Sequence, residues 1–163
     1  MSQLSLSLDS LLLVRDDQGR YLPATADQIL EAARYVIDQK IPGGTLFTSP
    51  ALVKDYLRTK LANFEHEVFA VLFLDSQNRL IEYVEMFRGT IDQASVYPRE
   101  VVKTALHHNA AAVIFSHNHP SGNSEPSQAD KLLTQRLKET LALVDVRTLA
   151  HIVVGGEATT SFA

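Results

Sequence analysis

The chain has 163 residues, of which 45% are hydrophobic, and this is enough for one domain with a substantial core. Its formal net charge of −4 argues against broad binding to nucleic-acid phosphates, which requires clustered lysine and arginine. It contains no cysteine, so only histidines and carboxylates remain as candidate metal ligands. The sequence shows no long apolar run and no signal-peptide pattern, and we therefore expect a cytoplasmic protein.

The first sixty residues are predicted to form a short strand and a turn followed by two helices. An apolar run and a polar stretch within residues 11–22 predict the strand and the turn. Thr25–Lys40 begins with a capping-box pattern and continues with apolar residues at helical spacing, which predicts the first helix. Ser49–Pro50 predicts the start of the second, because proline suits a first helical turn. We expect residues 1–60 to be a helical extension packed on the core.

The remaining residues, 61–163, are expected to form the main domain. Residues 67–75 contain a continuous apolar run typical of a buried central strand, and residues 80–88 return as a second strand. Further strands are expected at residues 110–115, 151–154 and 159–162, and further helices from Pro98 and from Ser127. This order of elements predicts an α/β layered domain with a mixed sheet.

The most informative polar residues follow the strand predicted at 110–115. His117 and His119 are one residue apart, so an extended backbone would point both imidazoles the same way. Asp130 follows across a loop rich in proline, glycine and serine. Two histidines and one carboxylate can supply the three protein ligands of a catalytic zinc site, whose fourth position is left for water.

Each of these residues also has a purely structural interpretation. Ser127 and Asp130 fit a Ser-x-x-acid helix start, so Asp130 could be only a capping residue. His117 and His119 could be ordinary hydrogen-bonded loop histidines. Taken together, the residues favour a metal site. The two roles of Asp130 are compatible, because Ser127 can cap the helix while Asp130 turns back toward the loop.

Two motifs make the sequence resemble a known family. They are His117-Asn118-His119-Pro120-Ser121-Gly122 and Ser127-x-x-Asp130, accompanied upstream by Gly89-Thr90 and Pro98-Arg99-Glu100. They resemble the JAMM motif of the MPN (JAB) metallopeptidases and, more specifically, the bacterial RadC family. For residues 61–163 the resemblance implies a RadC-like JAB/MPN metalloprotease domain. Its expected fold is a JAB/MPN-like (cytidine-deaminase-like) layered α/β domain, with a mixed β-sheet flanked by helices.

The resemblance also implies an activity and a metal. A JAMM-type protein is a zinc-dependent metallohydrolase that cleaves peptide or isopeptide bonds with a zinc-activated water. By this resemblance His117, His119 and Asp130 would hold Zn²⁺. The family usually carries an aspartate immediately before His151, and Ala150 stands there in this chain, so that carboxylate is missing.

Two catalytic residues follow from the same resemblance. Glu67, directly before the apolar strand, matches the upstream glutamate that acts as general base in JAMM proteins, and Glu65 is the alternative. Ser127 resembles the serine that stabilises the oxyanion of the tetrahedral intermediate. From local sequence alone, Glu67 would be a surface charge beside a core strand and Ser127 an N-cap.

Other classes of function stay open at this point. A DNA-repair-associated role is suggested by the historical label of the RadC family, and a catalytically silent MPN interaction domain could use the same fold. RadC proteins with a DNA-binding helix-hairpin-helix carry it near the amino terminus, and residues 1–62 contain no convincing counterpart. Residues 117–119 do not indicate an HNH nuclease, which spreads its motif over a ββα-metal unit. We expect a protein or peptide substrate, no direct DNA binding and no membrane association, and a homo-oligomer stays open.

Overall fold

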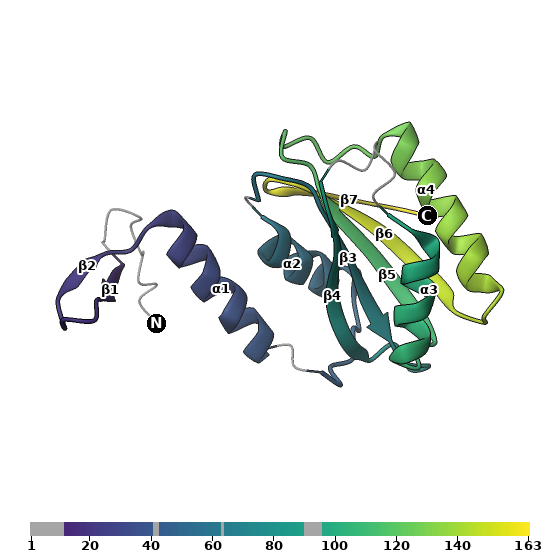
Figure 1. Cartoon of the computed structure of the whole chain (residues 1–163), viewed down its shortest axis with the longest axis horizontal. Helices are drawn as coiled ribbons and strands as arrows, with labels where there is room; N and C mark the ends of the chain where they lie inside the picture. The colour runs from purple at the N-terminus through teal and green to yellow at the C-terminus, as the bar shows by residue number, and fades with distance from the viewer. Residues whose placement is uncertain (1–11, 41–42, 63, 90–95) are drawn as a thin grey trace. The chain divides into compact units, whose positions relative to one another are not determined.

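The computed structural model describes residues 12–40, 43–62, 64–89 and 96–163 (Figure 1). Contacts within the chain divide it into two compact units, Met1–Lys40 and Ile41–Ala163. We expected the boundary after residue 60. The second helix instead belongs to the second unit, because its apolar side chains are buried and it contacts the main sheet.

The first unit contains a strand pair and one helix. The predicted strand is β1 (Leu13–Arg15), and after the turn it pairs antiparallel with a second strand, β2 (Tyr21–Pro23). Helix α1 (Ala26–Lys40) follows, and its capping box is reciprocal. The Gln28 amide donates to Oγ1 of Thr25 at 3.2 Å, and the Thr25 amide donates to Oε1 of Gln28 at 2.9 Å. The predicted helix and its first residues are therefore confirmed.

The second unit is built on a five-stranded sheet with the strand order β4-β3-β5-β6-β7 (Figure 1). The strands are β3 (Val68–Leu74), β4 (Leu80–Arg88), β5 (Ala112–Asn118), β6 (Arg147–Gly155) and β7 (Ala158–Phe162). β5 and β6 run parallel, whereas the other neighbours are antiparallel. The expected mixed sheet is therefore confirmed, with β3 inside it and every residue of β3 buried.

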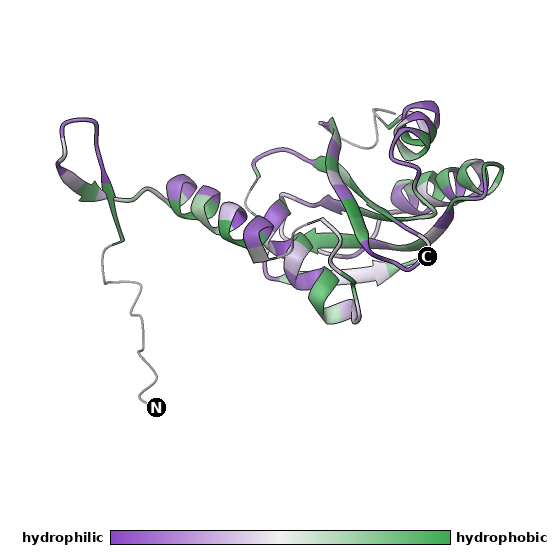
Figure 2. Cartoon of the chain, turned by 90° about the horizontal axis from the view of Figure 1, so that it is seen from below, coloured by the Kyte–Doolittle hydropathy of each residue, from purple (hydrophilic) through white to green (hydrophobic). Residues whose placement is uncertain are grey.

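Three helices flank this sheet. They are α2 (Pro50–Leu61), α3 (Pro98–His107) and α4 (Gln128–Ala142). α2 lies on one face of the sheet, and α3 and α4 lie together on the other (Figure 1). Alternate side chains of β3 and β5 form the core beneath α3 and α4, among them Phe69, Phe73 and Phe115. The helices show apolar and polar stripes in Figure 2, as expected for elements that cover a sheet.

Two strands are longer than the sequence predicted, and this changes the environment of the histidines. β5 continues to Asn118, where it pairs with Val154 of β6, and β6 begins at Arg147. His117 therefore lies inside a strand and is fully buried, whereas the sequence predicted the two histidines at the end of a strand that stops at residue 115. The apolar run ends at Phe115, but the backbone ladder continues through polar residues because β6 supplies their partners.

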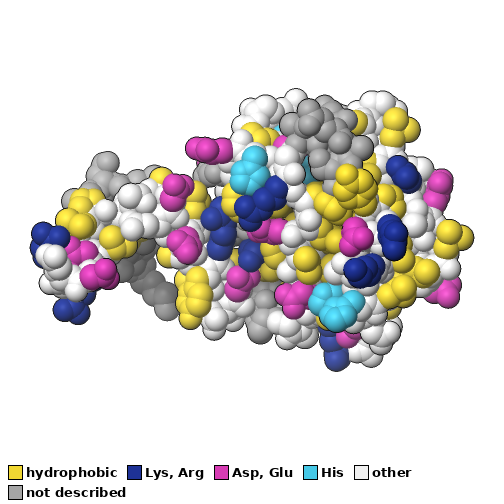
Figure 3. All heavy atoms as spheres, in the orientation of Figure 1, with side chains coloured by type: hydrophobic (Ala, Val, Ile, Leu, Met, Phe, Trp, Pro, Cys, Tyr) yellow, Lys and Arg dark blue, Asp and Glu magenta, His cyan; other side chains and the backbone are white. Residues whose placement is uncertain are grey.

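The surface gives two further observations. Among the described residues, no helix combines the length and apolar character needed to cross a bilayer. Acidic and basic side chains are interspersed with hydrophobic ones on the face shown in Figure 3, and the described residues form no broad basic field on that face.

Candidate metal centre

Three side chains that could hold a metal ion converge at the end of β5. His117 lies near the end of this strand, His119 directly follows it, and Asp130 comes from the first turn of α4. The two Nε2 atoms lie 2.9 Å apart. Oδ1 of Asp130 lies 3.3 Å from Nε2 of His117, and Oδ2 lies 3.3 Å from Nε2 of His119. One ligand atom from each residue lies within 4.8 Å of the others, so one ion could contact all three.

Asp130 takes part in a helix cap and also faces the histidines. The Ser127 amide donates to Oδ2 of Asp130 at 2.7 Å, and the Asp130 amide donates to Oγ of Ser127 at 3.1 Å. Burial alone would raise the pKa of Asp130. The hydrogen bond and charge of His117, together with the hydrogen bonds of Ser127, outweigh burial and hold this pKa well below its usual range. The carboxylate is therefore ionised at neutral pH, as a metal ligand must be.

The orientation of His119 is set by a backbone carbonyl. Its Nδ1 lies 2.7 Å from the carbonyl oxygen of Asn123, which can only accept a hydrogen bond. Nδ1 must therefore carry the hydrogen, and in the neutral imidazole Nε2 has a free lone pair directed at the other two side chains. The side chain is 14% exposed, whereas His117 and Asp130 are buried, so the cluster meets solvent at His119.

His117 contacts His151, which in turn contacts Thr134, and sequence reasoning did not connect either residue with His117. Its Nδ1 lies 2.7 Å from Nε2 of His151 in β6, and Nδ1 of His151 lies 2.6 Å from Oγ1 of Thr134 in α4. Burial and the charge of His117 hold the pKa of His151 well below its usual range, so its ring is neutral at neutral pH. The sequence contained two signals of these contacts. His151 is a polar residue directly before a buried apolar run, and Thr134 lies one helical turn after Asp130.

Asn118, between the two histidines, holds the beginning of β3. Its Oδ1 accepts a hydrogen bond from the Val68 amide at 2.7 Å, and its Nδ2 donates to the His66 carbonyl at 3.0 Å. These two backbone groups flank Glu67, which is partly buried. Glu65 is exposed and lies in a bend. The structure thus brings the segment that carries Glu67 against the residue that separates the two histidines.

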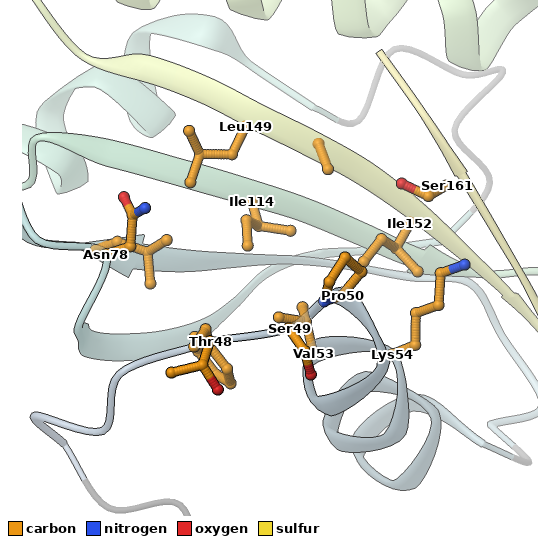
Figure 4. Close-up of a pocket in the computed structure, with 13 residues that line it drawn as sticks. Thr48, Ser49, Pro50, Val53, Lys54, Asn78, Ile114, Leu149, Ile152 and Ser161 are labelled. Atoms are coloured by element: carbon orange, nitrogen blue, oxygen red, sulfur yellow. The ribbon is translucent and has the colours of Figure 1, made fainter.

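Ala150 lies on the opposite face of the sheet from the histidine cluster. Its neighbour His151 points toward α4, and successive side chains of a strand alternate between faces. Ala150 lines a separate hollow of about 330 Å³ between the start of α2 and strands β5 to β7 (Figure 4). A carboxylate at position 150 would therefore face this hollow and not His117.

Among the described residues, the side chains of the remaining histidines do not belong to the candidate ligand cluster. His66 is exposed, with its ring near Phe64. His107 and His108 lie at the end of α3, where they contact each other, and His108 stacks on Phe73. These contacts match the solvated or packed roles expected for them.

Comparison with known proteins matches residues 47–163 to a family described as the RadC-like JAB domain. A UPF0758 protein of Vibrio cholerae is 60% identical over 136 residues, which cover 83% of this chain and 85% of the relative. A UPF0758 protein of Cellvibrio japonicus is 62% identical over 135 residues, which cover 83% of this chain and 60% of the relative. The matched region thus spans most of one relative and about three fifths of the other. The resemblance found in the motifs is confirmed.

Gly155, the last residue of β6, lies close to the loop that holds His119. A Cβ at position 155 would lie 2.5 to 2.7 Å from backbone atoms of Gly122, Asn123 and Ser124. Gly155→Ala should displace this loop, move the Asn123 carbonyl away from His119 and weaken metal binding about 10- to 100-fold. Chelator competition with Zn²⁺ or Co²⁺ measures the affinity.

Gly156→Ala is the matched control. A Cβ at position 156 meets no atom within 4 Å, and its φ of +61° adds only backbone strain of about 1–2 kcal/mol. The Gly156→Ala protein should keep the wild-type affinity. A folded Gly155→Ala protein that binds metal as tightly as wild type would show that the approach of β6 does not hold His119 in place.

Proposed function

Because the chain belongs to the RadC-like JAB domain family, we propose that it is a JAMM-type zinc hydrolase of peptide or isopeptide bonds. The observation that carries this proposal is the convergence of two imidazole nitrogens and one ionised carboxylate on a single point. These three groups surround a position at which they would stabilise a cation. The partial exposure of His119 leaves one side of that position accessible to a substrate.

The chemistry of the donors fits zinc. Imidazole nitrogen and carboxylate oxygen are ordinary zinc ligands, and three protein ligands with one open position are typical of catalytic zinc sites. Zinc bound there would polarise a substrate carbonyl and lower the pKa of water at the open position to about 7. The Asn123 carbonyl holds His119 in the tautomer that presents Nε2, and the cap interaction with Ser127 orients the Asp130 carboxylate.

We assign the proton transfer to Glu67. Amide hydrolysis needs a group that takes a proton from the attacking water and returns it to the leaving amine. The antiparallel register pairs Phe69 with His117, and if it were continued by two residues beyond this pair, Glu67 would be opposite His119. The hydrogen bonds of Asn118 to the backbone on both sides of Glu67 support the same assignment. Glu65 lies outside the segment that these hydrogen bonds hold, which favours Glu67 as the base.

We assign stabilisation of the oxyanion to Ser127. Its Oγ accepts the Asp130 amide hydrogen, and the hydroxyl hydrogen is still available to donate to a developing negative charge. The N-cap and the proposed catalytic role therefore use different parts of the same hydroxyl group. Ser127 is exposed, as a residue that contacts substrate would need to be.

The surroundings of His119 support a peptide substrate. A hollow of about 200 Å³ beside it is lined by Asn118, Pro120 and Ser121 together with the apolar side chains of Leu61, Phe64 and Val154. We propose that it receives a side chain of a peptide or protein substrate. The net charge of −4 gives no support to DNA as the partner. A silent interaction domain would bind a protein but fail the hydrolysis test below.

The proposed ligand set predicts near-equimolar zinc in protein purified without chelator. His117→Ala and His119→Ala should each reduce the zinc content sharply, because each removes one of three ligands. Asp130→Asn keeps an oxygen for the Ser127 amide but removes the negative charge, so it separates the ligand role from the cap. Elemental analysis with thermal melting measures both properties. The exposed His107→Ala is the control, and full zinc occupancy in the His119→Ala protein would refute the ligand set.

The assignment of Glu67 predicts a loss of activity without a loss of metal. Glu67→Gln removes the proton acceptor while nearly conserving volume, so hydrolysis of a suitable amide should fall by about 100-fold or more. Zinc content and folding should stay at the wild-type level. Hydrolysis assays against a peptide and isopeptide library, with zinc analysis on the same samples, measure the effect.

Glu65→Gln is the matched control for this prediction and should be close to wild type. A reversed result would identify Glu65 as the base. An active substrate that is cleaved equally by both variants would rule out a JAMM-type mechanism for this chain.

A further inference from the structure

A closed set of buried hydrogen bonds lies behind the candidate metal centre. Nδ1 of His117 contacts Nε2 of His151 at 2.7 Å, and Nδ1 of His151 contacts Oγ1 of Thr134 at 2.6 Å. Oγ1 of Thr134 donates to the Asp130 carbonyl oxygen at 2.6 Å. Oδ1 of Asp130 also lies 3.3 Å from Nε2 of His117, and this contact completes a loop that joins β5, β6 and α4.

The hydrogen positions in this set follow from its one backbone carbonyl. The Asp130 carbonyl only accepts, so the single hydroxyl hydrogen of Thr134 is used there. Oγ1 of Thr134 must then accept from His151, which places the hydrogen of the neutral His151 ring on Nδ1 and leaves Nε2 as an acceptor. Nδ1 of His117 therefore donates to His151, which leaves Nε2, 3.3 Å from Oδ1 of Asp130, as the nitrogen that can bind a metal.

Packing holds the His151 ring in the orientation that this arrangement requires. The ring stacks on Phe162 with a centroid distance of 4.7 Å and an interplanar angle of 21°. Phe69 and Phe115 contact it edge-on at centroid distances of 5.6 and 5.7 Å. His151 is fully buried among these rings, so it can rotate little and its two nitrogens keep their partners.

We propose that His151 and Thr134 are positioning residues that hold His117 in the tautomer and ring orientation needed to bind the metal. This inference rests on the metal-binding function proposed above. Thr134, which is not a candidate ligand, determines which nitrogen of His151 carries the hydrogen. His151 in turn determines which nitrogen of His117 faces the metal position without a hydrogen. Partners of this kind on ligating histidines typically change metal affinity about 10- to 100-fold when removed.

Loss of the Thr134 hydroxyl has a specific consequence. Without an acceptor at Nδ1, the His151 ring is free to carry its hydrogen on Nε2, from which it would donate to Nδ1 of His117. The hydrogen of a neutral His117 ring must then sit on Nε2, where it blocks the metal. A network that only packs α4 against the sheet would lower stability without changing this tautomer.

The test compares two threonines of α4 that make the same local hydrogen bond. Thr134 donates to the Asp130 carbonyl and Thr140 donates to the Arg136 carbonyl at 2.7 Å, but only Thr134 contacts a histidine. Zinc affinity of the whole chain, measured by chelator competition, should fall about 10- to 100-fold in Thr134→Val. It should stay within about twofold of wild type in Thr140→Val. Thr134→Ser keeps the hydroxyl and should restore most of the affinity.

A second measurement needs no variant. Long-range ¹H–¹⁵N NMR of metal-free wild-type protein at neutral pH should show the hydrogen of the His151 ring on Nδ1. Finding it on Nε2 of His151 would overturn the inference, as would wild-type zinc affinity in a folded Thr134→Val protein. If the wild type shows this tautomer but binds no zinc, the proposed function fails while the inferred hydrogen positions stand.

Discussion

The end of β5 is buried even though its residues are polar, and a buried polar group without a partner destabilises the folded state by about 1–3 kcal/mol. Asn118 finds its partners in the backbone at the start of β3. His117 finds its partner in His151 of β6, and through it in Thr134 of α4. Residues 117–118 thus connect β5 with β3, β6 and α4. The need to satisfy these groups explains why residues distant in the sequence meet at the candidate metal centre.

Asp130 links the stability of the fold to the chemistry of the site. The same carboxylate accepts the Ser127 amide at the start of α4 and faces both histidines. An ionised, buried carboxylate beside two ring nitrogens is costly unless a positive group is present. Metal binding would relieve this cost, so the metal-loaded protein should be the more stable form. The helix cap would thus orient this carboxylate before a metal binds.

The parts that could be predicted from the sequence are those encoded locally. The capping box of Thr25 and Gln28, the proline at the start of α2 and the apolar run of β3 each depend on neighbouring residues, and each prediction is confirmed. The pairing of β5 with β6, which are distant in the sequence, was not encoded in this way. The ladder with β6 extends β5 to Asn118, and the contact of His151 with His117 depends on the same ladder. The placement of Ala150 on the opposite face also depends on it, which is why the effect of the missing carboxylate could not be judged beforehand.

The most direct test of the central claim is X-ray absorption spectroscopy at the zinc edge of the whole, zinc-loaded chain. Two imidazoles, one carboxylate and one exchangeable ligand should give four nitrogen or oxygen neighbours at about 2.0 to 2.2 Å, with the outer-shell signal of two histidine rings. The His119→Ala protein, reloaded with zinc, should lose one ring from that signal. A spectrum without histidine scattering, or one unchanged by the substitution, would contradict a zinc site made by His117, His119 and Asp130.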